Sequence, residues 1–222
     1  MAVKQISKNK MDPIRIIKSK AVPLDMVNVD TDQIIPKQFL KLIHKTGYGK
    51  YLFYDWRFNS DGKLREDFVL NRPKYNRRQI LLARDNFGSG SSREHAAWAL
   101  RDYGFKAIIA PTFADIFYSN CFKNGILPVR LAHQELNYLF QNVDDIELEI
   151  NLPEQKITIM NSKNPRVVSF EVERSKKKIL LNGLDEIGIT LQLDRYIAEY
   201  ERRNPIRVLP DTTNEDPVNS VV

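Results

Sequence analysis

Cysteine is almost absent from this chain of 222 residues. Cys121 is the only one, so no internal disulfide can form. A single thiol also cannot provide the several thiolates that a self-contained cysteine-ligated metal or iron-sulfur site requires. Any such cluster that the protein uses must therefore be carried by a partner.

Long apolar runs are missing as well, and no stretch approaches the length needed to span a bilayer. The first residues carry positive charges but lack both the apolar segment and the small-residue cleavage site of a secretory signal. We therefore expect a cytoplasmic protein with no membrane partner.

The charge is not concentrated in one basic stripe. The net charge is +6 and the sequence pI is about 9.3, but the 34 basic residues are scattered among 28 acidic ones. This distribution argues against nucleic-acid binding. An anionic small molecule or an acidic partner subunit explains the sign of the charge equally well.

The centre of the chain has the clearest pattern of secondary structure. Short apolar runs predict buried strands, and apolar residues at helical spacing predict helices between them. Gly104 and Gly125 end the two helices. The elements in order are a strand at 80–83, a turn at 85–90, a helix at 93–103, a strand at 107–110, a helix at 112–123 and a strand at 126–129. This β-α-β-α-β run predicts an α/β fold with parallel strands.

The flanking regions have weaker patterns. We expect a first strand within 14–24, an exposed loop at 28–39 anchored by two isoleucines and Pro36, and a long irregular excursion over 41–75. After the core, the pattern predicts a helix from Ala132, strands at 146–150, 157–160 and 167–172, and a helix at 189–203. The predicted organisation is one domain, residues 1–205, with C-terminal helices, followed by a flexible tail, residues 206–222.

A turn rich in glycine and serine lies between the first central strand and its helix, at residues 86–95. Backbone N–H groups at a helix N-terminus attract anions, and glycines let the backbone approach a ligand. Arg93 adds a bidentate fork for a carboxylate or phosphate. The simpler alternative is a capping box between Ser91 and Glu94, which needs no ligand. Capping alone does not account for the additional serines or for an arginine in the first turn.

The segment DNFGSGSSREHAAWAL, residues 85–100, resembles the swivelling domain of the aconitase superfamily, whose hallmark is a GSSRE turn opening a helix. Residues 28–36 resemble the N-D-T-D-x-I-x-P loop of that family, and residues 113–128 its F-A-x-I-x-x-x-N-x-x-x-x-G-x-L-P run. Three motifs in the family's order cover residues 28–128. The resemblance implies a swivelling β/β/α domain with a β-α-β-α-β core and a C-terminal helical extension.

Within that superfamily, residues 47–57 look like the insertion of bacterial-type isopropylmalate dehydratase small subunits. This resemblance implies a heteromeric hydro-lyase of leucine biosynthesis that isomerises 2-isopropylmalate to 3-isopropylmalate. The [4Fe-4S] cluster would lie on a large subunit, and this chain would bind no metal. The alternatives are a small subunit for citraconate, 2-methylmalate or homoaconitate chemistry, and a non-enzymatic module that binds anions or RNA.

The resemblance also implies roles for individual residues. Ser91 matches the base that removes the proton, and Asp32 matches an acid that orients or protonates the hydroxyl. Arg93, Ser92 and Thr31 match residues that bind substrate.

Other candidates have simpler interpretations. We expect His95 to pack structurally and Cys121 to be a buried filler residue. His44 and His133 have no evident partners in the sequence. The aromatic stretch 48–58 is expected either to cover the isopropyl group or to pack against the large subunit.

Overall fold

The structure is a computed structural model that describes residues 11–41, 46–161, 165–184, 188, 190 and 193–204. The chain divides into two compact units, residues 1–186 and 187–222. The strands are β1 (Ile16–Ser19), β2 (Ala21–Pro23), β3 (Ile80–Leu82), β4 (Ala107–Ala110), β5 (Leu127–Arg130), β6 (Glu147–Asn151), β7 (Lys156–Met160) and β8 (Arg166–Ser169). The helices are α1 (Thr31–Ile34), α2 (Tyr54–Arg57), α3 (Glu94–Tyr103), α4 (Asp115–Lys123), α5 (His133–Gln141), α6 (Arg174–Asn182) and α8 (Asp194–Arg203). Short 3₁₀ turns lie at Lys37–Phe39, Gly49–Tyr51, Val69–Asn71 and Pro73–Tyr75.

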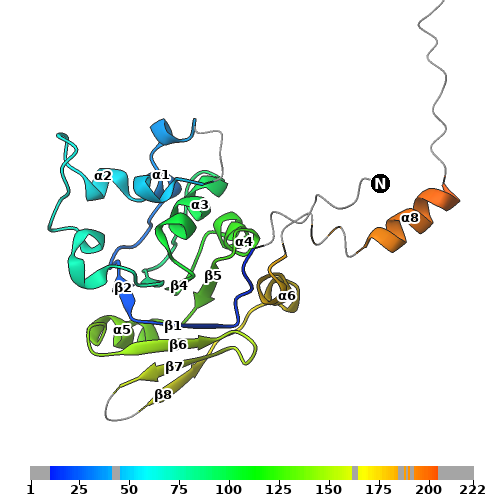
Figure 1. Cartoon of the computed structure of the whole chain (residues 1–222). Helices are drawn as coiled ribbons and strands as arrows, with labels where there is room; N and C mark the ends of the chain where they lie inside the picture. Colours follow the sequence, from blue (N-terminus) through cyan, green and yellow to red (C-terminus); the bar gives the residue numbers. More distant parts are fainter. Residues whose placement is uncertain are drawn as a thin grey trace, which may run out of the picture. The chain divides into compact units, whose positions relative to one another are not determined.

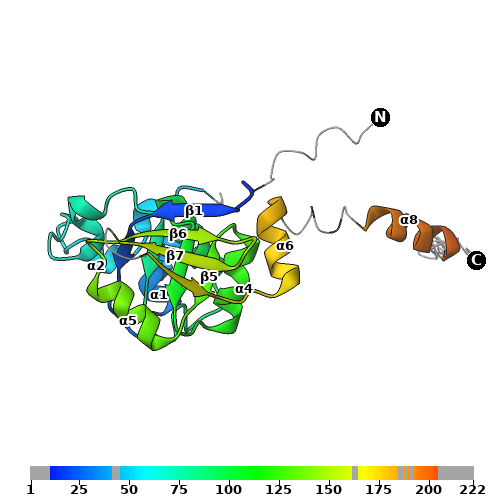
Figure 2. The same cartoon turned by 90° about the horizontal axis from the view of Figure 1, so that it is seen from below.

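Two four-stranded sheets form the first unit. The parallel sheet has the order β2-β3-β4-β5, and the antiparallel sheet has the order β1-β6-β7-β8. Figure 1 shows α3 and α4 on one side of the parallel sheet and the antiparallel sheet on its other side. In Figure 2, seen from below, β1, β6 and β7 of the antiparallel sheet face the viewer. These three layers confirm the predicted α/β class and the β-α-β-α-β core.

The parallel strands are buried on both faces, as strands between two layers must be. All residues of β3 and β4 are buried. In β6 and β7 only alternate residues are buried, because one face of the antiparallel sheet is covered and the other is open to solvent. The hydrophobic core therefore lies between the sheets and beneath α3 and α4.

The first predicted strand is in fact two strands. β1 pairs with β6 in the antiparallel sheet, whereas β2 pairs with β3 in the parallel sheet. Lys20 alone separates them. The continuous apolar pattern of residues 14–24 hid this change of sheet, because both strands contribute buried residues.

Three further expectations need correction. The segment 28–39 is not simply an exposed loop: it forms α1 and a 3₁₀ turn, although Ile34 and Ile35 are buried anchors as expected. Helix α4 begins three residues later than predicted, because residue 113 forms a bridge with Phe87. Helix α6 is absent from the predicted elements, since its three consecutive lysines obscure the helical period.

The irregular excursion is folded where the structure describes it, over 46–75. Tyr48, Leu52 and Phe53 are completely buried. The N–H of Tyr48 donates to the Asp102 carboxylate at 2.9 Å, which ties the excursion to the end of α3. Local turns and tertiary contacts of this kind leave no periodic signal in the sequence.

The second unit contains α8. None of its residues is buried, and Tyr196 and Tyr200 are exposed. Of the predicted helix at 189–203, Thr190 and α8 are helical and Leu193 forms a turn, while the predicted tail and His44 lie outside the described residues. The domain limits proposed from the sequence stay a prediction.

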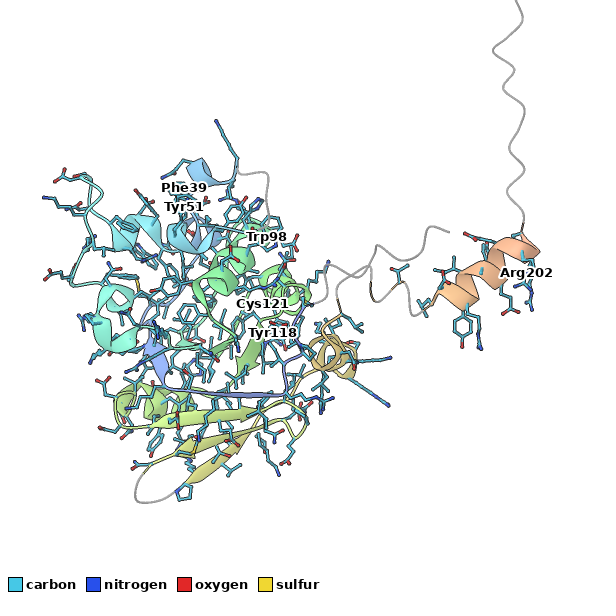
Figure 3. The ribbon with its side chains drawn as sticks, viewed as in Figure 1. Phe39, Tyr51, Trp98, Tyr118, Cys121 and Arg202 are labelled. Carbon is cyan, nitrogen blue, oxygen red and sulfur yellow. The ribbon has the colours of Figure 1, made fainter. Side chains whose placement is uncertain are left out.

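No helix in the described parts of the chain is long and apolar enough to cross a membrane. Cys121 is completely buried in α4 (Figure 3), as expected of a filler residue. Burial raises the pKa of its thiol well above the ordinary value.

This burial predicts that Cys121 is inert in the folded protein. A thiol-specific reagent such as Ellman's reagent should label no cysteine at pH 8 under native conditions and one per chain in denaturant, because only unfolding exposes the thiol and restores its ordinary pKa. The raised pKa contributes stability below the ordinary thiol pKa of about 8.5, and this contribution is lost as the pH rises through the higher folded value. Rapid stoichiometric labelling of the native chain would contradict the burial.

Candidate active site

Two loops at the carboxyl ends of β2 and β3 run side by side and build the site. The N–H of Gly88 donates to the carbonyl of Val29 at 2.7 Å, and the N–H of Thr31 donates to the carbonyl of Ser89 at 2.8 Å. The pairing has the form of a parallel bridge between Asp30 and Ser89. It brings the two motifs of 28–36 and 86–95 together although about sixty residues separate them.

Glycine is required in the second loop for two reasons. Gly88 and Gly90 have φ angles of +79° and +86°, a region that other residues rarely adopt. A Cβ on Gly88 would also lie 2.1 Å from the ring of Phe117. The loop therefore sits directly on α4, and its path is set by this close contact.

The capping box between Ser91 and Glu94, the alternative to a ligand site, does not form at the start of α3. The N-cap residue is Arg93, and no side chain caps the first turn. Glu94 instead accepts a bond of 2.9 Å from the Asn124 amide, which also bonds Trp98 and so joins α3 to the end of α4. Ser91 and Ser92 are exposed in front of the helix. The serines are thus available to a ligand instead of being used in capping.

The five residues predicted for the site converge. Arg93 donates to the carboxylate of Asp32, and the hydroxyl of Thr31 donates to the carbonyl of Ser91 at 2.8 Å. The side chain of Arg93 is 14% exposed and that of Asp32 is 37% exposed. The Arg93 guanidinium is thereby held in a half-buried position next to the two exposed serines.

Two groups of this site were not predicted. Asp30 and Gln33 form a reciprocal capping box at the start of α1, the short helix that contains Asp32. The signal was present in the sequence as an acidic residue followed three positions later by Gln. Lys37 also lies 3.9 Å from Asp32, so this carboxylate faces two cations.

His95 packs between aromatic rings, as expected. Its ring centroid lies 4.5 Å from that of Trp98 and 5.4 Å from that of Tyr48. Burial lowers the pKa of its imidazole, which favours the neutral form at pH 7. His133, in contrast to the expectation, has a partner: its Nε2 lies 2.8 Å from the Asp85 carboxylate.

The aromatic stretch 48–58 divides into buried and surface residues. Tyr48 and Phe53 belong to the core, which removes them as substrate contacts. Tyr51 stacks on Phe39 with ring centroids 4.1 Å apart (Figure 3). Tyr54 packs against the same ring at 4.7 Å. The partly buried cluster of Phe39, Tyr51 and Tyr54 is therefore a candidate apolar cover.

An iron-sulfur cluster does not fit the residues of this chain. The one thiol is buried and protonated. Among the described residues, no three side chains of His, Cys, Asp or Glu are grouped in a way that could hold a metal ion. The site consists of hydroxyls, a guanidinium and a carboxylate, which suits binding of an organic acid and movement of a proton.

The fold and these loops define an aconitase C-terminal domain, and the model of that family matches residues 11–134. The chain belongs, more narrowly, to the family of 3-isopropylmalate dehydratase small subunits, a family of hydro-lyase subunits. It is 53% identical to the 3-isopropylmalate dehydratase small subunit of Brevibacillus brevis, over 87% of this chain and 100% of the relative. It is also 53% identical to the 3-isopropylmalate dehydratase small subunit of a Geobacillus sp., over 87% of this chain and 98% of that relative.

A solved structure agrees with the family. The 3-isopropylmalate dehydratase of Methanocaldococcus jannaschii matches with a TM-score of 0.58 and 28% sequence identity, over 84% of this chain and 99% of that one. The layered α/β fold is therefore shared with an experimentally determined member.

Substitution of Gly88 tests how tightly the loop is placed. Gly88→Ala should lower the free energy of unfolding by about 3 kcal/mol or more, because the new Cβ collides with Phe117 and the φ angle is positive. Gly62→Ala is the matched control: Gly62 has a φ of +72° but no atom within 4 Å of the new Cβ. It should cost only about 1 kcal/mol. Equal losses in urea unfolding would show that the contact with Phe117 does not constrain the loop.

Proposed function

We propose that this chain is the small subunit of a heteromeric hydro-lyase that isomerises 2-isopropylmalate to 3-isopropylmalate in leucine biosynthesis. The convergence of Ser91, Arg93 and Asp32 at the open N-terminus of α3 carries the proposal. The substrate is taken from the names of the relatives, which are called 3-isopropylmalate dehydratase small subunits. The expected cytoplasmic location stays a prediction.

The proposed partner is a large subunit that carries a [4Fe-4S] cluster. The name "small subunit" of the relatives supports such a partner, and the residues of this chain do not fit a cluster. When bound, the cluster would supply a Lewis acid for the departing hydroxyl group. The groups on this chain would then act on the proton and on a substrate carboxylate.

In the proposed mechanism Ser91 removes the proton from the carbon next to the leaving hydroxyl, and the electron pair of that C–H bond forms the alkene. In the rehydration, a hydroxyl group adds to the carbon that lost the proton, and Ser91 returns the proton to the carbon that lost the hydroxyl. A serine hydroxyl is a weak acid, so its alkoxide requires strong local stabilisation. The uncapped N–H groups of α3 and the nearby guanidinium of Arg93 support that stabilisation.

Arg93 is proposed to bind a carboxylate of the substrate. Asp32 is its only acidic partner among the described residues and engages one terminal nitrogen, which leaves the other side of the guanidinium fork for a ligand. Ser92, exposed beside it, would donate a further hydrogen bond. Thr31 supports the site indirectly, because its hydroxyl is bound to the carbonyl of Ser91. Asp32 would thus fix the direction of Arg93 in addition to acting on the hydroxyl side of the substrate.

Ser91→Ala tests the proposed base. We expect kcat to fall by about three orders of magnitude or more in the complex with the large subunit, because the variant lacks the hydroxyl group that is proposed to take the proton. The measurement is anaerobic reconstitution, following the ultraviolet absorbance of the alkene intermediate. Ser89→Ala is the control within the same turn and should keep most of the activity. Full activity of Ser91→Ala would leave the serine without a catalytic role.

Asp32→Asn tests the positioning of Arg93. The substitution keeps the size of the side chain and removes the charge that holds the guanidinium, so KM should rise about tenfold with an additional loss in kcat. Asp67→Asn removes the carboxylate of an exposed pair with Arg65 and should change neither constant. A fall in kcat with unchanged KM would indicate that Asp32 acts only in the chemical step.

A further inference from the structure

A second concentration of charge lies beside α6, outside the candidate active site. It is a cavity of about 520 Å³, and eight residues line it: Arg15, Gln155, Val172, Arg174, Lys177, Lys178, Leu181 and Asn182. Four of these are cations and none is acidic. We call this feature the basic cavity.

The cations of the basic cavity lack counter-charges. Among the described residues, Arg15, Arg174 and Lys178 form no ion pair, and the ammonium group of Lys177 donates to the carbonyl of Pro153 at 2.6 Å instead of to a carboxylate. By contrast, Lys176, whose ammonium group lies over the ring of Tyr118, is paired with Glu173. Figure 3 shows nitrogen-tipped side chains projecting from α6.

The arrangement is electrostatically unfavourable for the isolated chain. The N-cap residue of α6 is Glu173, but its carboxylate binds Ser175 and Lys176, and the first turn of the helix contains Arg174 and no acidic residue. Arg174 and Lys178 are four positions apart on the same helix, where like charges repel. An anion placed in the basic cavity would relieve this repulsion.

The shape of the basic cavity favours an extended anion. Its volume is several times that of a single carboxylate or phosphate group. The apolar side chains of Val172 and Leu181 can accept methylene groups, and the amides of Gln155 and Asn182 can bind a peptide backbone. No aromatic residue lines it, so it offers no stacking platform for nucleotide bases.

We infer that the basic cavity is a docking site for an acidic segment of the large subunit, with two or more Asp or Glu side chains bound by Arg15, Arg174, Lys177 and Lys178. This inference rests on the proposed heteromeric function. It also accounts for a part of the net charge of +6, since the complementary charge would lie on the partner.

The test compares two charge reversals of equal size in the full chain. Arg174→Glu with Lys178→Glu changes the basic cavity, and Lys63→Glu with Lys106→Glu changes two exposed lysines that form no ion pair in the described part of the chain. Glutamate at position 174 lies in the first turn of α6, where it complements the helix dipole, and the double variant keeps a pair of like charges four positions apart, so it should fold normally. The dissociation constant for the purified large subunit is measured by sedimentation at low and high salt.

The basic-cavity variant should bind the large subunit at least about tenfold more weakly at low salt, with a reduced dependence on salt, because attractive contacts become repulsive. The control variant should stay within about twofold of the unsubstituted chain. Turnover at saturating large subunit should be the same for all three proteins. Equal binding by the two variants would overturn the inference while leaving the proposed function intact.

Two further outcomes also decide the question. Inorganic pyrophosphate is titrated into each chain without the large subunit. If the basic-cavity variant loses pyrophosphate binding but assembles normally, the cavity is a site for small anions and the docking inference is wrong. If the unsubstituted chain neither binds nor activates the large subunit, the proposed function fails, and the docking inference fails with it.

Discussion

The candidate active site depends on a short parallel pairing of two loops, the bonds of Gly88 to Val29 and of Thr31 to Ser89. These two backbone bonds place the hydroxyls and the guanidinium of one loop beside the carboxylate of the other, and the bonds of Arg93 to Asp32 and of Thr31 to Ser91 complete the link. The pairing continues the register of β2 and β3 beyond the ends of both strands. The parallel sheet therefore determines the geometry of the chemistry above it, and the site inherits the rigidity of the most deeply buried part of the protein.

The loop pairing in turn depends on α4. Gly88 rests on Phe117, and the ring of Phe87 lies 5.4 Å from the ring of Phe117, centroid to centroid. At the other end of α4, Asn124 joins Glu94 and Trp98 of α3. One helix thus supports both the loop before α3 and the first turn of α3 itself. This explains why the third family motif, residues 113–128, belongs to the site although none of its residues is proposed to touch the substrate.

Much of this arrangement was predictable from the sequence, for physical reasons. Buried parallel strands produce continuous apolar runs, and the glycine, serine and arginine of the 86–95 turn indicate a candidate ligand site by their chemistry. The pairing of Asp32 with Arg93 was not predictable, because it joins residues sixty-one positions apart through tertiary structure. The sequence also could not distinguish a capping box at Ser91 and Glu94 from the observed bond of Glu94 to Asn124, since both use the same glutamate. Helix α6 was not predicted, because lysines occupy three consecutive positions in a segment where apolar residues at helical spacing would otherwise indicate a helix.

The passage from β1 to β2 through Lys20 alone has a further consequence. Side chains alternate between the two faces of a strand, so inserting or deleting one residue there would turn every side chain of one strand to the opposite face. The apolar side chains of β1 or of β2 would then point away from the core, since β1 belongs to one sheet and β2 to the other. The turn around Gly62 can be lengthened, because a new side chain there meets no other atom within 4 Å. The spacing between Ser19 and Ala21 is fixed instead by the alternation of side chains along the two strands. Length conservation at Lys20, more than the identity of the residue, should therefore mark this fold among distant relatives.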